Sequence, residues 1–114
     1  MKILIVEDNA DAAMAVELIL QSIGHQTQVA QSIGAARAVL ESGDVALLLT
    51  DLTLPDGAGQ TLTDEHPGLP AIAMSGHPRS THWERCQQAG FVDYLEKPIS
   101  LAVLVGSVRS VLGE

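Results

Sequence analysis

The chain has 114 residues, a size that suits one domain with a single hydrophobic core. Its formal net charge is −8 with only six Lys and Arg residues, which excludes the basic surface that a nucleic-acid-binding protein needs. No apolar segment approaches the roughly 18 residues of a membrane span, and the N-terminal sequence lacks the pattern of a signal peptide. The single cysteine, Cys86, rules out an internal disulfide, so we expect a soluble, cytoplasmic protein.

The first half of the chain alternates predicted strands and helices. Residues 2–6 form a nearly continuous apolar run, which is typical of a strand buried on both faces of a parallel sheet. Apolar residues at helical spacing follow over residues 12–23. Residues 25–30 alternate polar and apolar side chains, as an edge strand does. A second helix begins after the N-cap candidate Ser32 and ends near Gly43.

The second half continues this alternation. Three further strands are predicted at residues 45–50, 70–75 and 90–96. Helical patterns follow them over residues 58–66, 79–90 and 101–112. Five strands that alternate with five helices predict an α/β fold, in which a doubly wound parallel sheet carries helices on both faces. No linker interrupts the pattern, so residues 1–114 are predicted to form a single domain.

Polar side chains stand at the carboxyl ends of the predicted strands, where open α/β sheets bind their ligands. They are Glu7 and Asp8 after the first strand, Asp51 after the third, Ser75 after the fourth and Lys97 after the fifth. Taken singly, each suits a helix cap or a solvated surface. Three carboxylates at one edge repel each other, however, and Mg²⁺ would relieve that repulsion. The hydroxyl and the ammonium group are suited to binding phosphoryl oxygens.

The segments KILIVEDN, LLLTDLTLPDGAG, PAIAMSG and AGFVDYLEKPIS resemble the receiver domain of bacterial two-component response regulators. This resemblance implies a flavodoxin-like sheet of five parallel strands in the order 2-1-3-4-5. It also implies a phosphoacceptor signalling module of a phosphorelay. The expected donor is a histidine kinase or a histidine phosphotransfer protein, and the expected target is a downstream protein partner or output domain.

The resemblance also implies roles for the residues at the strand ends. Asp51 would be the phosphorylated nucleophile, in a reaction that depends on Mg²⁺. Glu7, Asp8 and Asp51 would hold the metal ion together with the backbone carbonyl of Thr53. Lys97 would contact the phosphoryl group and offset its negative charge.

A conformational switch is implied as well. Ser75 would be drawn towards the phosphorylated Asp51, which frees space into which Tyr94 turns. The surface of the fourth helix, fifth strand and fifth helix would change with it, and a homodimer could form there. The Lys97–Pro98 peptide bond would be cis.

The third predicted helix departs from this family because Pro67 limits it to residues 58–66, about 13 Å at 1.5 Å per residue. A strand of five or six residues spans roughly 17–20 Å, so the helix cannot cover its neighbours. We therefore expect an exposed apolar groove between the second and fourth helices, which would be a partner site. Alternatively, those helices close in, or Trp83 or Leu69 covers the gap.

Three other functions stay open from the residues alone. An aspartate-based phosphatase would use Asp51 as nucleophile, but it would need a second acid where Thr53 stands. A flavin-binding module would need hydroxyl-rich phosphate loops and aromatic residues that flank the flavin ring, and the chain has one Trp and one Tyr. A receiver-like domain could also bind partners without being phosphorylated. The histidine spacing does not fit a zinc site.

Overall fold

The computed structural model describes all 114 residues. The helices are α1 (Ala10–Ser22), α2 (Ile33–Glu41), α3 (Gln60–Glu65), α4 (Arg79–Gln88) and α5 (Leu101–Leu112). The strands are β1 (Lys2–Val6), β2 (Gln26–Ala30), β3 (Val45–Asp51), β4 (Thr53–Leu54), β5 (Gly57–Ala58), β6 (Ala71–Ser75) and β7 (Asp93–Glu96). No helix is long and apolar enough to cross a bilayer.

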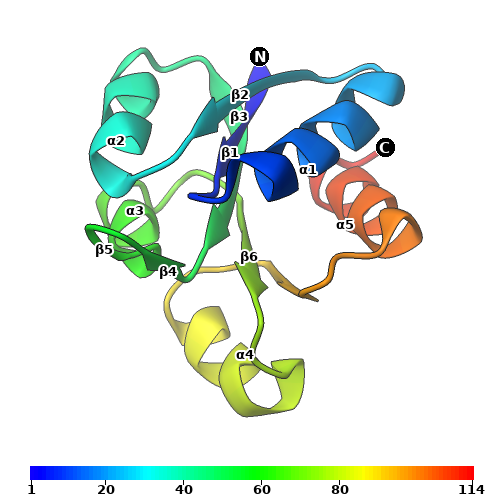
Figure 1. The fold of residues 1–114 in the computed structure, drawn as a ribbon. Helices are drawn as coiled ribbons and strands as arrows, with labels where there is room; N and C mark the ends of the chain where they lie inside the picture. The colour runs from blue at the N-terminus through cyan, green and yellow to red at the C-terminus, as the bar shows by residue number, and fades with distance from the viewer.

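Five parallel strands form the central sheet in the order β2-β1-β3-β6-β7. In chain order these are strands 2-1-3-4-5, so the predicted topology is confirmed. Helices α1 and α5 cover one face, whereas α2, α3 and α4 cover the other (Figure 1). Because all five strands run in the same direction, their carboxyl ends meet at one edge of the sheet.

The hydrophobic core consists of two layers because side chains alternate along each strand. In β1, Ile3 and Ile5 face α1 and α5, whereas Leu4 and Val6 face α2 and α3. Strand β3 behaves in the same way, and its residues from Leu47 to Asp51 are all buried. Burial on both faces explains why these strands read as continuous apolar runs and why Asp51 is held on rigid backbone.

A short antiparallel hairpin, β4–β5, follows β3 and was not predicted. Asp56 in its turn accepts hydrogen bonds from the backbone N–H groups of Ile33 and Gly34, at 2.9 and 3.0 Å. These donors are otherwise unpaired at the start of α2, so Asp56 caps that helix beside Ser32. The hairpin is thereby fixed against α2 directly beyond Asp51.

Helix α3 has only six residues, fewer than the nine that the sequence allowed. The expectation of an apolar groove between α2 and α4 is nevertheless wrong. Leu62 of α3 is fully buried, and Leu69 and Trp83 pack, partly buried, against the same side of the core. The hydroxyl of Thr63 donates to the Ala89 carbonyl at 3.2 Å and joins α3 to the end of α4. Side chains from neighbouring segments therefore cover the core where the short helix α3 does not reach.

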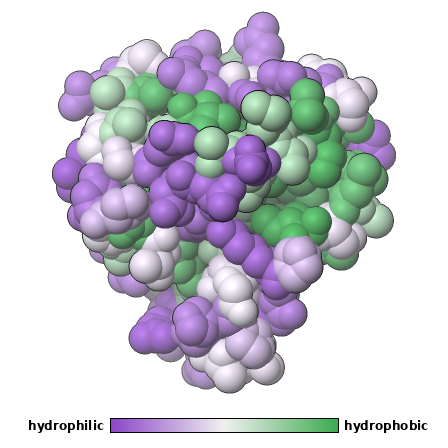
Figure 2. Space-filling model, in the orientation of Figure 1, coloured by the Kyte–Doolittle hydropathy of each residue, from purple (hydrophilic) through white to green (hydrophobic).

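Exposed apolar side chains lie elsewhere on the surface. The large ones on helices are Met14 and Leu18 of α1 and Leu101 and Val103 of α5. Figure 2 shows apolar residues gathered over α1 and α5, next to a polar area at the start of α1. The large exposed apolar side chains on helices thus lie on α1 and α5, away from the short α3.

Candidate phosphoacceptor site

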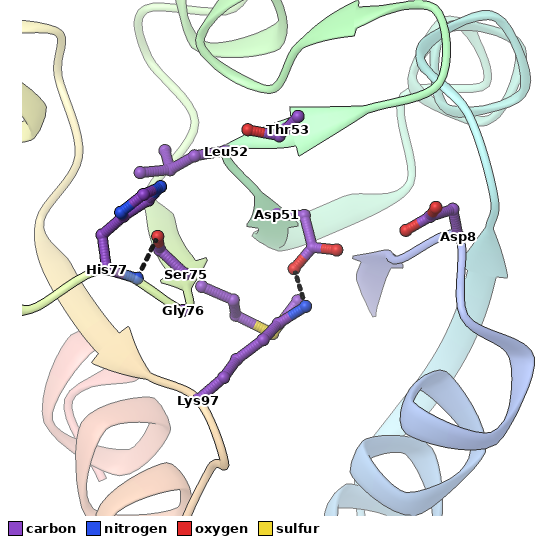
Figure 3. A pocket seen from close by; sticks show the side chains of 9 residues that line it. Asp8, Asp51, Leu52, Thr53, Ser75, Gly76, His77 and Lys97 are labelled. Atoms are coloured by element: carbon purple, nitrogen blue, oxygen red, sulfur yellow. Dashed lines mark hydrogen bonds and ion pairs between the residues drawn. The ribbon is translucent and has the colours of Figure 1, made fainter.

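The five polar residues predicted at the strand ends come together at the carboxyl edge of the sheet, and Thr53 lies beside them. An open cavity of about 440 Å³ there is lined by Asp8, Asp51, Thr53, Ser75 and Lys97, among others (Figure 3). Glu7 lies behind this lining and is only 3% exposed. The sequence therefore identified the residues of one site, although they are spread over 90 positions of the chain.

Lys97 is the centre of the charge arrangement. Its Nζ lies 2.8 Å from Glu7 Oε2 and 2.6 Å from Asp51 Oδ1. The first contact has the geometry of a hydrogen bond, whereas the second is a close ion pair without hydrogen-bond alignment. One ammonium group thus lies between two buried carboxylates, which leaves one negative charge uncompensated when both are ionised.

This excess of negative charge shifts the acidity of the pair. Burial is the main cause that raises the pKa of Asp51 to about 7, and the contact with Glu7 is the second. Lys97 opposes the shift. Burial also acts to raise the pKa of Glu7, but Asp51 and Lys97 outweigh it, so that this pKa lies below its ordinary value. In the metal-free protein at neutral pH, Glu7 is therefore ionised and Asp51 titrates.

The acidic residues fit a divalent cation. Carboxylate oxygens of Glu7, Asp8 and Asp51 all lie within 4.8 Å of one another, and Asp8 is exposed at the mouth of the cavity. Asp51 Oδ1 contacts the Lys97 ammonium, whereas the other carboxylate oxygen of Asp51 points towards Asp8 and is available to a metal ion (Figure 3). Mg²⁺ prefers oxygen ligands and retains several waters, which this open cavity accommodates.

Ser75 and Tyr94 are connected through the backbone of His77. The His77 N–H donates to Ser75 Oγ at 3.0 Å, and the Tyr94 hydroxyl donates to the His77 carbonyl at 2.7 Å. Tyr94 is only 2% exposed, so its ring is already inside. The movement of Ser75 and Tyr94 on phosphorylation stays a prediction, and it starts from a buried Tyr94 ring.

Two further features of the site follow from the backbone. The Lys97–Pro98 bond is cis, as the resemblance implied. Gly59, which sequence reasoning overlooked, packs against Asp51 so closely that a Cβ there would lie 2.0 Å from the Asp51 carbonyl oxygen. In the sequence, the only indication of a role for Gly59 was its position directly after the predicted turn over Pro55, Asp56 and Gly57.

The sequence profile described as the response regulator receiver domain matches residues 3–109. The chain belongs to this family. Its fold is the five-stranded receiver fold, and its function is that of a phosphoacceptor signalling module in two-component systems. The family does not favour the phosphatase alternative.

Individual receivers support this assignment. Response regulator protein PilR of Pseudomonas aeruginosa is 31% identical over 115 residues, which cover 97% of this chain and 26% of PilR. Polar-differentiation response regulator DivK of Brucella anthropi is 29% identical over 98% of this chain and 96% of its own. The chain thus spans about a quarter of PilR but nearly all of DivK.

Solved structures agree with the sequence relatives. A two-component response regulator from Clostridium difficile superimposes with a TM-score of 0.91 at 25% identity, over 100% of this chain and 97% of its own. The receiver domain of NtrX from Brucella abortus has a TM-score of 0.89 at 27% identity, over 98% of both chains. The receiver fold is therefore retained in full, despite the short α3.

Proposed function

We propose that Asp51 accepts a phosphoryl group from a phosphohistidine of a histidine kinase or a histidine phosphotransfer protein. The observation that carries this proposal is the buried Asp51 carboxylate, fixed by Lys97 at the base of an open cavity. A carboxylate oxygen of Asp51 bonds to phosphorus while the bond from phosphorus to the donor imidazole nitrogen breaks, and that nitrogen keeps the electron pair.

The other site residues prepare this transfer. Glu7, Asp8, Asp51 and the Thr53 carbonyl would hold Mg²⁺, which neutralises charge on the phosphoryl oxygens when it is bound. The Lys97 ammonium, already 2.6 Å from Asp51, would stabilise the same charge from the opposite side. The Ser75 hydroxyl, at the cavity wall, would donate a hydrogen bond to a phosphoryl oxygen.

Phosphorylation should require both Asp51 and the metal ion. Incubation with a small phosphodonor and Mg²⁺ should add the mass of one phosphoryl group to the intact protein, and the Asp51→Asn variant or a chelator should abolish the addition. Mass spectrometry of the intact chain measures this directly. A phosphoryl group that is still added to Asp51→Asn would assign the acceptor elsewhere.

Mg²⁺ should also stabilise the fold, because it relieves repulsion among Glu7, Asp8 and Asp51. Free metal at about a hundred times its dissociation constant would add about 2.7 kcal/mol to the free energy of unfolding. Thermal unfolding with and without millimolar Mg²⁺ tests this. Asp8→Asn, which removes an exposed ligand, should reduce the gain, and equal midpoints for the unmodified chain would refute a metal site.

The chain acts as one receiver domain over residues 1–114, and its output is a change in the surface that it offers to partners. It catalyses its own phosphorylation and dephosphorylation and is not a turnover enzyme. The downstream target is a protein partner or an output domain. The face formed by α4, β7 and α5 is also where two copies would associate.

The switch should pass through His77, since its backbone contacts both Ser75 and Tyr94. When a phosphoryl group draws the Ser75 hydroxyl away, the His77 N–H loses its acceptor and the loop moves. Beryllofluoride with Mg²⁺ should therefore shift the NMR signals of His77, Tyr94 and α4. In Tyr94→Phe, which lacks the hydroxyl that contacts the His77 carbonyl, the NMR signals of β7 should no longer shift. Unchanged α4 signals in the unmodified chain would contradict this route.

A further inference from the structure

A second cavity opens directly beside the phosphoacceptor cavity. It measures about 220 Å³ and lies between the β4–β5 hairpin and α4. Leu52, Thr53 and His77 line both cavities, so the two share a wall. No carboxylate lines the second cavity, whereas Arg85, His77 and His82 all do. A ligand that reaches Asp51 therefore has a basic neighbour on its α4 side.

Three of the six Lys and Arg residues form no ion pair with a carboxylate, and Arg85 is the one of these three that lines the second cavity. The chain has only six Lys and Arg residues against a net charge of −8. Arg37, Arg79 and Lys97 form ion pairs with carboxylates at 2.6 to 2.8 Å, whereas Arg85 has no carboxylate within 4.0 Å. Its guanidinium group is thus free to bind an anion that comes from outside the chain.

A ring stack and two hydrogen bonds hold the wall between the cavities. The His77 ring stacks on the His82 ring with centroids 4.5 Å apart and planes 13° from parallel. The His77 backbone is fixed at the same time by Ser75 on its N–H and by Tyr94 on its carbonyl. Burial, followed by repulsion from His77 and Arg85, lowers the pKa of His82, so the permanent positive charge here is that of Arg85.

We propose that this second cavity is an anion subsite in which Arg85 binds the carboxylate leaving group of an acyl phosphate donor. The proposal rests on the proposed role of Asp51 as phosphoacceptor. In this reaction an Asp51 oxygen bonds to phosphorus, and the bond from phosphorus to the acyl oxygen breaks. The carboxylate leaves with the electron pair, and no proton is transferred.

The chemistry of the leaving group decides what Arg85 contributes. Negative charge develops on the departing carboxylate in the transition state, and a guanidinium group beside it stabilises that charge. Phosphoramidate transfers the same phosphoryl group but releases ammonia, which carries no negative charge. Arg85 should therefore accelerate transfer from acetyl phosphate and have no such effect on transfer from phosphoramidate.

The test compares second-order rate constants for the two donors with Mg²⁺ at low salt, measured by mass spectrometry of the phosphorylated chain. Arg85→Gln should lower the acetyl phosphate constant about two- to fivefold, the range of an exposed ion pair, and leave the phosphoramidate constant unchanged. Arg85→Lys should retain most of the rate. Arg109→Gln, which removes an arginine from α5 instead, is the matched control and should change neither constant.

Salt gives a readout that a purely structural role of Arg85 would not affect. The difference between the unmodified chain and Arg85→Gln should shrink when the salt concentration rises, because an exposed charge is screened. An equal loss with both donors, or no loss with acetyl phosphate, would overturn the subsite while Asp51 phosphorylation by phosphoramidate stands. If neither donor labels the unmodified chain, the proposed function fails and the subsite with it.

Discussion

Asp51→Asn should raise the free energy of unfolding of the metal-free chain by about 1–3 kcal/mol at pH 8 and by almost nothing near pH 4. The reason is the pKa of Asp51, which burial and Glu7 raise from 3.8 to about 7 in the folded state. Between these values the folded chain binds more protons than the unfolded chain, so stability falls as pH rises. Asparagine removes that cost, and the expected gain is smaller than the full pKa shift implies because Asp51 faces an open cavity whose water screens its charge.

Urea unfolding of both proteins in chelator, at several pH values from 4 to 8, measures this difference. Asp64→Asn, which removes an exposed carboxylate from α3, is the control and should change stability little at any pH. The effect should begin above pH 4 and be complete above pH 7. A difference that does not change with pH would mean that Asp51 is ionised throughout and that its environment has been misjudged.

Gly59→Ala should destabilise the fold by about 3 kcal/mol or more, the upper range for overpacking. An added Cβ would lie 2.0 Å from the Asp51 carbonyl oxygen and 3.0 Å from Thr50 Oγ1. The atom in the way is backbone, so it cannot rotate aside. Gly59 also donates its N–H to the Leu52 carbonyl at 2.9 Å, which holds it against the strand end. A shift of the backbone at this point would displace Asp51, the proposed nucleophile.

The matched control is Gly106→Ala in α5, where an added Cβ meets nothing within 4 Å. That change should be neutral or stabilising by about 0.5–1 kcal/mol, because alanine favours a helix. Thermal or urea unfolding distinguishes the two variants. Where Gly59→Ala remains folded, its phosphorylation by a small donor should be slower than that of Gly106→Ala. If the unfolding midpoint of Gly59→Ala equals that of the unmodified chain, the β4–β5 hairpin can move to make room for the added Cβ at little cost.

The sequence by itself predicted a parallel α/β sheet and the polar residues at its carboxyl edge, whereas the strand order came from the resemblance to receiver domains. Alternating apolar runs and helical periods specify five strands and five helices, and the buried strands must then be parallel. Parallel strands bring their carboxyl ends to one edge, so Glu7, Asp8, Asp51, Ser75 and Lys97 had to meet. These inferences succeed because they depend on the order of elements and on side-chain periodicity, which are local properties of the chain.

Only the tertiary structure decided how the space between elements is filled. The short α3 was predicted, but the groove beside it is absent, since Leu62, Leu69 and Trp83 pack there from three separate segments. Packing of this kind depends on the rotamers and volumes of side chains distant in sequence, which no local pattern encodes.

The same limit applies to the details of the site. The burial of Tyr94, the stacking of His77 on His82 and the absence of a carboxylate beside Arg85 all arise where α4 meets the carboxyl edge of the sheet. The charge balance of Asp51 likewise depends on how deeply it is buried and on its distances from Glu7 and Lys97. Spacing in the chain predicts which groups share an edge. Their distances and desolvation, which set acidity and contacts, are properties of the folded molecule.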